Sequence, residues 1–121
     1  MADLMGTDKL TIYHNPACSK SRETLQIIVQ NKKNPEIIEY LKNPPGKEEL
    51  TRVIKLLGIS ARDLLRKTEP AYIDSKLDEL STDEQIIDSI CEYPILLQRP
   101  IVISGNQAVI GRPPSKVLDI I

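Results

Sequence analysis

The stretch from Leu10 to Tyr40 constrains the fold most, because strand and helix signals alternate there within about 30 residues. Leu10–Tyr13 is rich in β-branched and aromatic residues and predicts a short strand. A helix is predicted from about Ser19 to Lys32, and a second short strand over Glu36–Tyr40. Two strands joined by one crossover helix pair in parallel, so the chain begins with a βαβ unit.

The middle of the chain, from about 47 to 93, is predicted to be helical. Gly58 is suited to end a first helix, and Ser60 to begin a short one through Leu65. A capping box is available to a later helix from Ser81 with Glu84 or from Thr82 with Gln85. The stripes at helical spacing, helix by helix, are Leu25, Ile28 and Val29, with Lys32 closing the last turn; Leu50, Val53, Ile54 and Leu57; and Ile86, Ile87, Ile90 and Cys91.

Strand signals return near the end of the chain. Ile101–Ile103 and Ala108–Ile110 flank a Gly-Asn turn and predict a β-hairpin. A final short helix is expected from Ser115 onward, with Val117, Leu118 and Ile121 facing inward. This element order predicts an α/β fold, namely a thioredoxin-like mixed four-stranded sheet. We expect one domain over residues 1–121, with a helical insertion at about 47–93.

Charge and composition exclude several classes of function. The net charge is −1, without the basic footprint of a nucleic-acid-binding protein or a polybasic membrane-binding run. No apolar stretch approaches the roughly 18 residues of a membrane span. Residues 1–8 are expected to form a tail without a signal peptide. The two cysteines are far apart and form no disulfide framework, so we expect a reducing compartment, the cytoplasm.

Cys18 lies where the first strand gives way to the first helix. Free amide groups and the positive end of the helix dipole meet at such a position, and they lower the pKa of a thiol. His14 and Arg22 can add positive charge, and Ser19 and Ser21 are small donors for an anion. The alternative is that Cys18 is an inert buried thiol and His14 an exposed residue without a task.

Several kinds of site are excluded by what the sequence lacks. One histidine and two distant cysteines do not make a zinc site, so no metal is expected. Ser21 stands where a C-x-x-C pair would have its second cysteine, so that pair is absent. Thr24 stands where a phosphatase-type anion loop would have its arginine, so that loop is absent too. Cys18 then needs a thiol from another molecule unless Cys91 reaches it, and Cys91 is expected in the core.

Three arginines stand beside apolar runs or prolines, namely Arg66, Arg99 and Arg112. Arginine binds oxyanions through a planar set of donors, although each of the three can equally be a solvated surface charge. Arg99 and Arg112 flank the predicted hairpin, so both can face one edge. Most X–Pro bonds are trans, but Pro100 precedes the third strand, where a cis bond would lie beside the active cysteine of a thioredoxin-like fold.

The segment from His14 to Arg22 (HNPACSKSR) resembles the active-site signature of the glutaredoxin-coupled arsenate reductases. Further blocks of that family are matched in the same order by Leu64-Leu65-Arg66-Lys67, Arg99-Pro100-Ile101-Val102 and Gly111-Arg112-Pro113. The resemblance runs from about Leu10 to Ile121.

This resemblance implies that Cys18 attacks arsenate and that glutathione and glutaredoxin complete the reduction to arsenite. It implies that Arg66, Arg99 and Arg112 bind the oxyanion. From their position next to Cys18, Ser21 and Arg22 are further candidates for oxyanion binding. The resemblance also implies that His14 lowers the pKa of the thiol. Glutathione would be a co-substrate, and no bound cofactor is expected.

Ser19-Lys20 differs from the Gly-Thr pair that follows the cysteine in family members with a dedicated arsenic role. It resembles a related branch, so the thiol chemistry carries over more firmly than the substrate. Two alternatives remain: an Spx-like transcription regulator, whose usual C-x-x-C switch is absent here, and a thiol reductase of another oxyanion or mixed disulfide. The electron donor, the oligomeric state and the role of Cys91 do not follow from the sequence.

Overall fold

A computed structural model describes residues 9–121, so the predicted tail and the question of a signal peptide lie outside the described part. The chain folds as two compact units. One unit runs up to Tyr40 and resumes from Arg99 to Ile121, and the other spans Leu41–Gln98. The first unit holds the sheet, and the expected insertion at 47–93 falls within the second.

The sheet has four strands: β1 (Leu10–His14), β2 (Glu36–Glu39), β3 (Ile101–Ser104) and β4 (Gln107–Ile110). Their order is β2-β1-β3-β4. β2 runs parallel to β1, while β3 is antiparallel to both β1 and β4. This is the mixed sheet predicted for a thioredoxin-like fold. All five residues of β1 are buried, as expected of a central strand.

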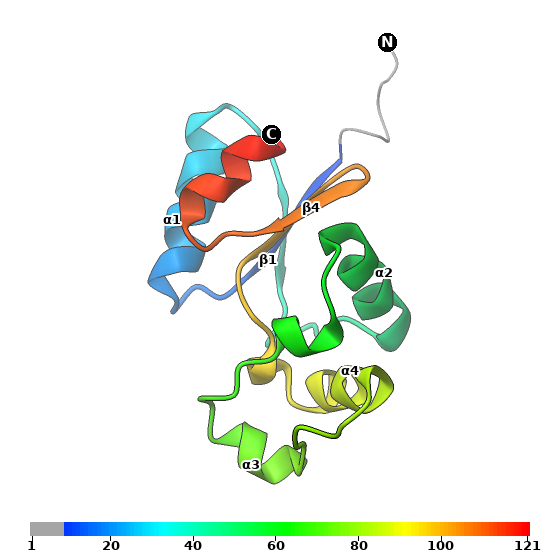
Figure 1. Ribbon diagram of the computed structural model, residues 1–121. Coiled ribbons are helices and arrows are strands. Elements are labelled where there is room, and N and C mark those ends of the chain that lie inside the picture. Colours follow the sequence, from blue (N-terminus) through cyan, green and yellow to red (C-terminus); the bar gives the residue numbers. More distant parts are fainter. Residues whose placement is uncertain (1–8) are drawn as a thin grey trace. The chain divides into compact units, whose positions relative to one another are not determined.

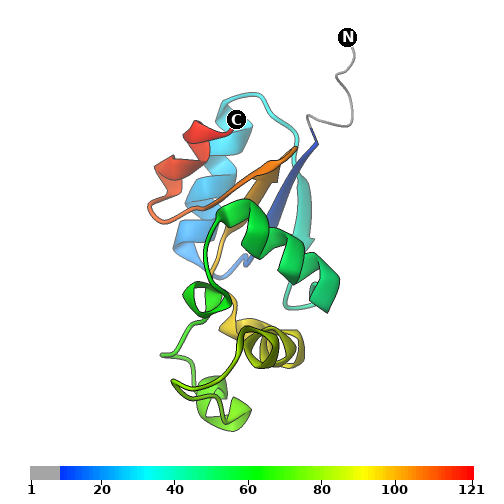
Figure 2. The ribbon, with the colours of Figure 1, turned by 45° about the vertical axis from the view of Figure 1, so that its right-hand side comes forward.

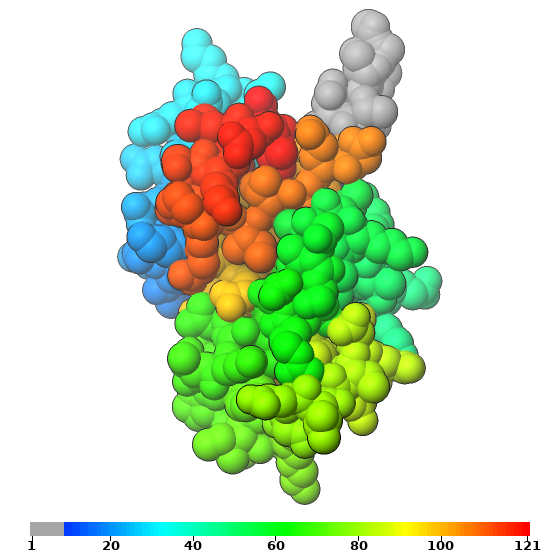
Figure 3. Space-filling view, viewed as in Figure 1, coloured from blue at the N-terminus to red at the C-terminus, as the bar shows by residue number. Residues whose placement is uncertain are grey.

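Helix α1 (Ser19–Gln30) connects β1 to β2, as predicted for the βαβ unit. The short 3-10 helix η4 (Pro114–Asp119) lies beside α1 on the same side of the sheet (Figures 1 and 2). In the space-filling view, η4 (red) lies against the blue and cyan surface of α1 and the residues after it (Figure 3). The buried core residues in this layer are Leu10, Ile12, Ile28, Val102 and Val117.

Two predictions about α1 were wrong in detail. The helix ends at Gln30 rather than Lys32, and Lys32 has a left-handed backbone with φ of 62°. Val29 is 57% exposed although Ile28 is fully buried. The periodic stripe is wider than the surface available to cover it, because the sheet contacts only part of the helix circumference.

The unit Leu41–Gln98 is helical, with α2 (Lys47–Leu57), η2 (Ala61–Leu64), α3 (Ala71–Ser75), α4 (Asp83–Glu92) and η3 (Pro94–Leu96). Gly58 ends α2 in the left-handed conformation, as predicted. Thr82 and Gln85 form the capping box of α4, with Gln85 N donating to Thr82 Oγ1 at 3.2 Å. The packed side chains of this unit include Leu50, Val53, Leu64, Ile86 and Ile90.

The unit is closed by a short antiparallel link on either side of Leu65 and Leu97. Arg66 N donates to Leu96 O at 2.7 Å, and Gln98 N donates to Leu64 O at 2.8 Å.

The predicted hairpin is present, and Gly105 has φ of 60° in its turn. The last helix was predicted less well, because it begins at Pro114 with 3-10 geometry and leaves Leu118 50% exposed.

Candidate functional site

Cys18 occupies the N-cap of α1, directly after the loop that ends β1. Its φ and ψ of −99° and 123° are extended, so its amide still belongs to the loop while its carbonyl accepts from Arg22 N at 3.0 Å. Asn15 shapes the loop, since its side-chain Oδ1 accepts from Ala17 N at 3.0 Å and its carbonyl accepts from Cys18 N at 2.9 Å. The sequence analysis missed Asn15. An Asn before Pro is a turn signal that could have identified it.

The sulfur of Cys18 is surrounded by hydrogen-bond donors. Burial by itself raises the pKa of the Cys18 thiol, but donors outweigh it and hold that pKa below its ordinary value. Hydrogen bonding from the backbone of Ser21, from the side chain of Arg99 and from the backbone of Lys20 lowers the pKa of the thiol, in that order of strength. Such bonds favour the thiolate because they are stronger to the anion.

Arg112 is the second arginine at the sulfur, with Nη2 3.8 Å from Cys18 Sγ. Its Nε donates to the carbonyl of Arg99 at 2.8 Å, so the two arginines are held together. The Arg99–Pro100 and Arg112–Pro113 peptide bonds are both cis. The structure therefore brings together at the sulfur two of the three arginines that the sequence singled out.

His14 does not act as a cation beside the sulfur. Burial lowers the pKa of His14, the Glu39 carboxylate raises it, and Arg22 lowers it, and the net result is below the ordinary value. A lowered pKa favours the neutral ring at neutral pH, so the positive charge that the sequence allowed for His14 is disfavoured. Its Nδ1 lies 2.6 Å from Ser21 Oγ, which also accepts from Asn15 N at 3.0 Å. His14 thus contacts the cysteine loop through Ser21.

Ser21 and Arg22 are placed differently from a simple oxyanion ligand. The hydroxyl of Ser21 is fully buried against His14, and it is the amide of Ser21 that faces the sulfur. Arg22 is exposed, and its Nη1 donates to the carbonyl of Pro16 at 2.8 Å. Both residues hold the loop, and neither side chain has a hydrogen bond to Cys18 among those found in the described residues.

Arg66 belongs to the other unit, Leu41–Gln98. Its Nε pairs with Glu69 Oε2 at 3.2 Å, and its side chain is only 19% exposed. A half-buried guanidinium that is already paired is not a loose surface charge. Its assignment to the oxyanion rests on the sequence resemblance.

Cys91 lies near the end of α4 and is partly exposed rather than in the core, so that prediction was wrong. The preceding residue, Ile90, is fully buried. Because successive residues are rotated around the helix axis, Cys91 lies at the edge of the packed face. Its sulfur donates to the carbonyl of Pro45 at 3.6 Å. Burial, and then the Asp88 carboxylate, raise the pKa of the Cys91 thiol.

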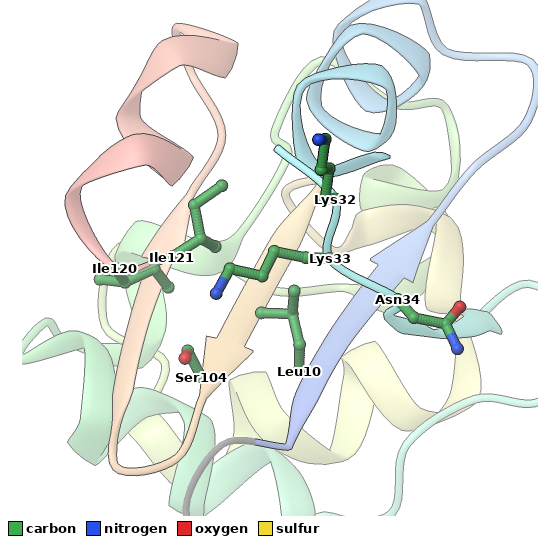
Figure 4. Close-up of a pocket in the computed structure, with 7 residues that line it drawn as sticks. All are labelled: Leu10, Lys32, Lys33, Asn34, Ser104, Ile120 and Ile121. Atoms are coloured by element: carbon green, nitrogen blue, oxygen red, sulfur yellow. The ribbon is translucent and has the colours of Figure 1, made fainter. Parts of the chain in front are cut away.

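A hollow of about 370 Å³ lies at the opposite end of the sheet strands from Cys18. It is lined by Leu10 and Ser104 at strand ends, by Lys32, Lys33 and Asn34 after α1, and by Ile120 and Ile121 (Figure 4). In Figure 4, Lys33 extends across it while Lys32 and Asn34 point away. The residues of this hollow contribute nothing to the thiol site.

Across residues 9–121, no three His, Cys, Asp or Glu side chains gather where they could hold a metal ion. Within the same range, no helix has the length and apolar character needed to cross a bilayer. The groups that gather around Cys18 are therefore donors: amides of the first turn of α1 and two guanidinium groups. Such a set can stabilise a thiolate and hold an oxyanion beside it.

Comparison with known proteins agrees with this geometry. An arsenate reductase of Acidiphilium multivorum is 46% identical over 113 residues, which cover 93% of this chain and 80% of that protein. The uncharacterized protein YfgD of Escherichia coli is 43% identical over 117 residues, covering 95% of this chain and 98% of its own. The solved structure of an arsenate reductase from Vibrio cholerae superposes with a TM-score of 0.90 at 40% identity, covering 95% and 99% of the two chains.

A family model supplies the last comparison. The model of the ArsC family matches residues 13–120. This range includes the cysteine loop, the helical unit Leu41–Gln98 and, after that unit, both arginine–proline pairs. The fold of the V. cholerae structure agrees over nearly the whole chain. On the sequence, the fold and the surroundings of Cys18, this chain belongs to the ArsC family.

Proposed function

We propose that this protein reduces arsenate to arsenite through the thiolate of Cys18, with glutathione and glutaredoxin as electron donors. The observation that carries the proposal is the position of the Cys18 sulfur, which lies among the amides of Lys20 and Ser21 and the guanidinium groups of Arg99 and Arg112. A thiolate is the nucleophile, and cations beside it attract a negatively charged oxyanion. The arsenate reductases among the relatives are 40–46% identical to this chain.

The reaction balances with two external thiols. The Cys18 thiolate attacks arsenic(V), an oxygen leaves as water, and a sulfur–arsenic bond forms. A thiol of glutathione and a thiol of glutaredoxin then become one mixed disulfide, and their two electrons reduce arsenic(V) to arsenic(III). Hydrolysis releases arsenite and the free thiol. External thiols are needed because Ser21, rather than a second cysteine, stands three residues after Cys18.

The three arginines have distinct parts in this proposal. Arg99 and Arg112 stabilise the thiolate and bind the oxyanion oxygens, and Arg66 supplies a third guanidinium. His14 and Ser21 keep the cysteine loop in shape. We place the reaction in the cytoplasm, where glutathione keeps thiols reduced.

A coupled assay with arsenate, glutathione and glutaredoxin tests the proposal. We expect turnover that requires all three reagents and is inhibited when Cys18 is alkylated. Omission of glutaredoxin or glutathione separates the two donors. Arg66→Gln is expected to raise the KM for arsenate, and Arg52→Gln, an exposed residue of α2, is the matched control.

The relative YfgD is an uncharacterized protein, so the substrate is the part of the proposal that needs the most direct test. The same assay is run with other tetrahedral oxyanions and with a glutathione mixed disulfide in place of arsenate. Faster turnover of one of these than of arsenate would show that the protein is a thiol reductase with a different substrate. Binding of RNA polymerase without any turnover would instead support a regulator.

A further inference from the structure

Gly111 lies at a close approach between the end of β4 and helix α1. It is buried and directly precedes Arg112. A Cβ at this position would lie 2.5 Å from Thr24 Oγ1, 3.2 Å from Thr24 Cγ2 and 2.8 Å from Pro100 Cγ. Non-bonded carbon atoms prefer separations of about 3.5–4.0 Å. Only a hydrogen fits here unless one of the two segments moves.

Thr24 fastens one side of this contact to the turn that holds the sulfur. It is fully buried, and its Oγ1 donates to the carbonyl of Lys20 at 2.8 Å. The amides of Lys20 and Ser21 are the donors that reach Cys18 Sγ. A push on Thr24 is therefore transmitted to the first turn of α1.

The other side of the contact carries the two arginines. Gly111 N donates to the carbonyl of Pro100 at 2.9 Å, and Arg112 Nε donates to the carbonyl of Arg99 at 2.8 Å. These bonds join the Arg99-Pro100 and Arg112-Pro113 segments on either side of the glycine. Arg112 Nη2 then lies 3.8 Å from the sulfur.

We propose that Gly111 is a positioning residue, whose missing side chain lets the arginine segments approach α1 closely enough for Arg99 and Arg112 to reach Cys18. Thr24 is its counterpart on the helix. The inference rests on the proposed function in one respect only: it takes the sulfur of Cys18 as the reacting atom. The arginine guanidinium groups touch the sulfur directly, while Gly111 and Thr24 act through them.

A methyl group at position 111 separates the two segments by about 1 Å if the contacts are to return to normal distances. A displacement of that size at a reacting centre costs about 100-fold in rate. We therefore expect Gly111→Ala to lower kcat/KM for arsenate about 100-fold. Because the arginines then stabilise the thiolate less, alkylation of Cys18 requires a higher pH.

The test compares four proteins that all carry Cys91→Ser, so that only Cys18 is titrated: the parent, Gly111→Ala, Thr24→Ala and the Gly111→Ala/Thr24→Ala double variant. Thr24→Ala removes both Thr24 atoms that the new methyl group meets. Because the contact with Pro100 Cγ remains, the double variant is expected to recover part of the alkylation shift and about tenfold of the lost kcat/KM relative to Gly111→Ala. Gly46→Ala is the control glycine variant, since a Cβ there meets nothing within 4 Å.

The pH dependence of Cys18 alkylation is measured without arsenate, so it is informative even if arsenate proves not to be the substrate. Folding of each variant is checked by circular dichroism. A folded Gly111→Ala with the alkylation profile of the parent overturns the inference. If Gly111→Ala does not fold, the double variant decides, and an ordinary thiol profile in that folded variant also overturns it.

Discussion

The two cysteines have a similar, partial burial and opposite surroundings. Cys18 stands at the beginning of α1, where amides of the first turn and two arginines point at its sulfur. Cys91 stands near the end of α4, where its sulfur donates to a carbonyl and Asp88 lies nearby. Burial raises the pKa of both thiols, and only at Cys18 do donors reverse that effect.

This difference shows that neighbouring donors and charges give two partly buried thiols opposite pKa shifts. Helix N-termini present unpaired N–H groups, whereas C-termini present carbonyls that disfavour an anion. A thiol that donates to a carbonyl is held in its protonated form. Cys18 is thus suited to attack, and Cys91 is suited to remain inert.

The largest expected difference between the two cysteines is in the effect of replacing each of them with serine. Cys18→Ser is expected to abolish arsenate reduction, a loss of at least about 1,000-fold, because a serine hydroxyl is not ionised at neutral pH. Cys91→Ser is the matched control and is expected to keep activity within about twofold. Steady-state assays with glutathione and glutaredoxin measure both. Equal losses in the two variants would contradict the assignment.

Removing a cation from the reactive thiol is expected to have the next largest effect. Arg112→Gln retains hydrogen-bonding capacity but loses the charge beside Cys18, and we expect kcat/KM for arsenate to fall about 100-fold. The pKa of the Cys18 thiol rises in this variant, since a cation favours the thiolate. Alkylation at a series of pH values measures the shift, with Arg52→Gln as the control. An unchanged profile would show that Arg112 does not stabilise the sulfur.

The unmodified protein already offers a direct contrast between the thiols. Because the pKa of Cys18 is lowered and that of Cys91 is raised, we expect Cys18 to be alkylated at least about tenfold faster at pH 7. The ratio should narrow as pH rises, since Cys91 then ionises as well. Peptide mapping after brief treatment with iodoacetamide gives both rates. Faster labelling of Cys91 at pH 7 would reverse the comparison.

Neutralising the charge beside the unreactive thiol is expected to have the smallest effect. Asp88 raises the pKa of Cys91, so Asp88→Asn should lower it and speed labelling of Cys91 by about twofold to threefold. Labelling of Cys18 should not change. Asp74→Asn, an exposed position on α3, controls for the general loss of one negative charge. Slower labelling of Cys91 in Asp88→Asn than in the unmodified protein would contradict this electrostatic explanation.

The local parts of the site could be predicted from the sequence because they depend on neighbours along the chain. The N-cap position of Cys18 follows from a strand, a proline and a helix in succession, and the hairpin follows from a Gly-Asn turn between two β-branched runs. The sequence left open whether His14 adds positive charge, because its burial, which lowers its pKa, cannot be read from a loop sequence. Cys91 was placed in the core because the helical spacing of apolar residues predicts which side of α4 is packed. It does not predict where the packed side ends.

The sequence by itself determined the βαβ unit, the position of Cys18 at the start of α1 and the two arginine–proline pairs beside the hairpin. The tertiary structure alone decided that Arg99 and Arg112 both reach that sulfur, that Ser21 turns its hydroxyl to His14, and that Gly111 packs against Thr24. Helix caps and turns arise from interactions a few residues apart. The contact between Arg112 and Cys18 joins residues 94 positions apart. The pairing of β3 with β1 and of β4 with β3 brings these distant segments together.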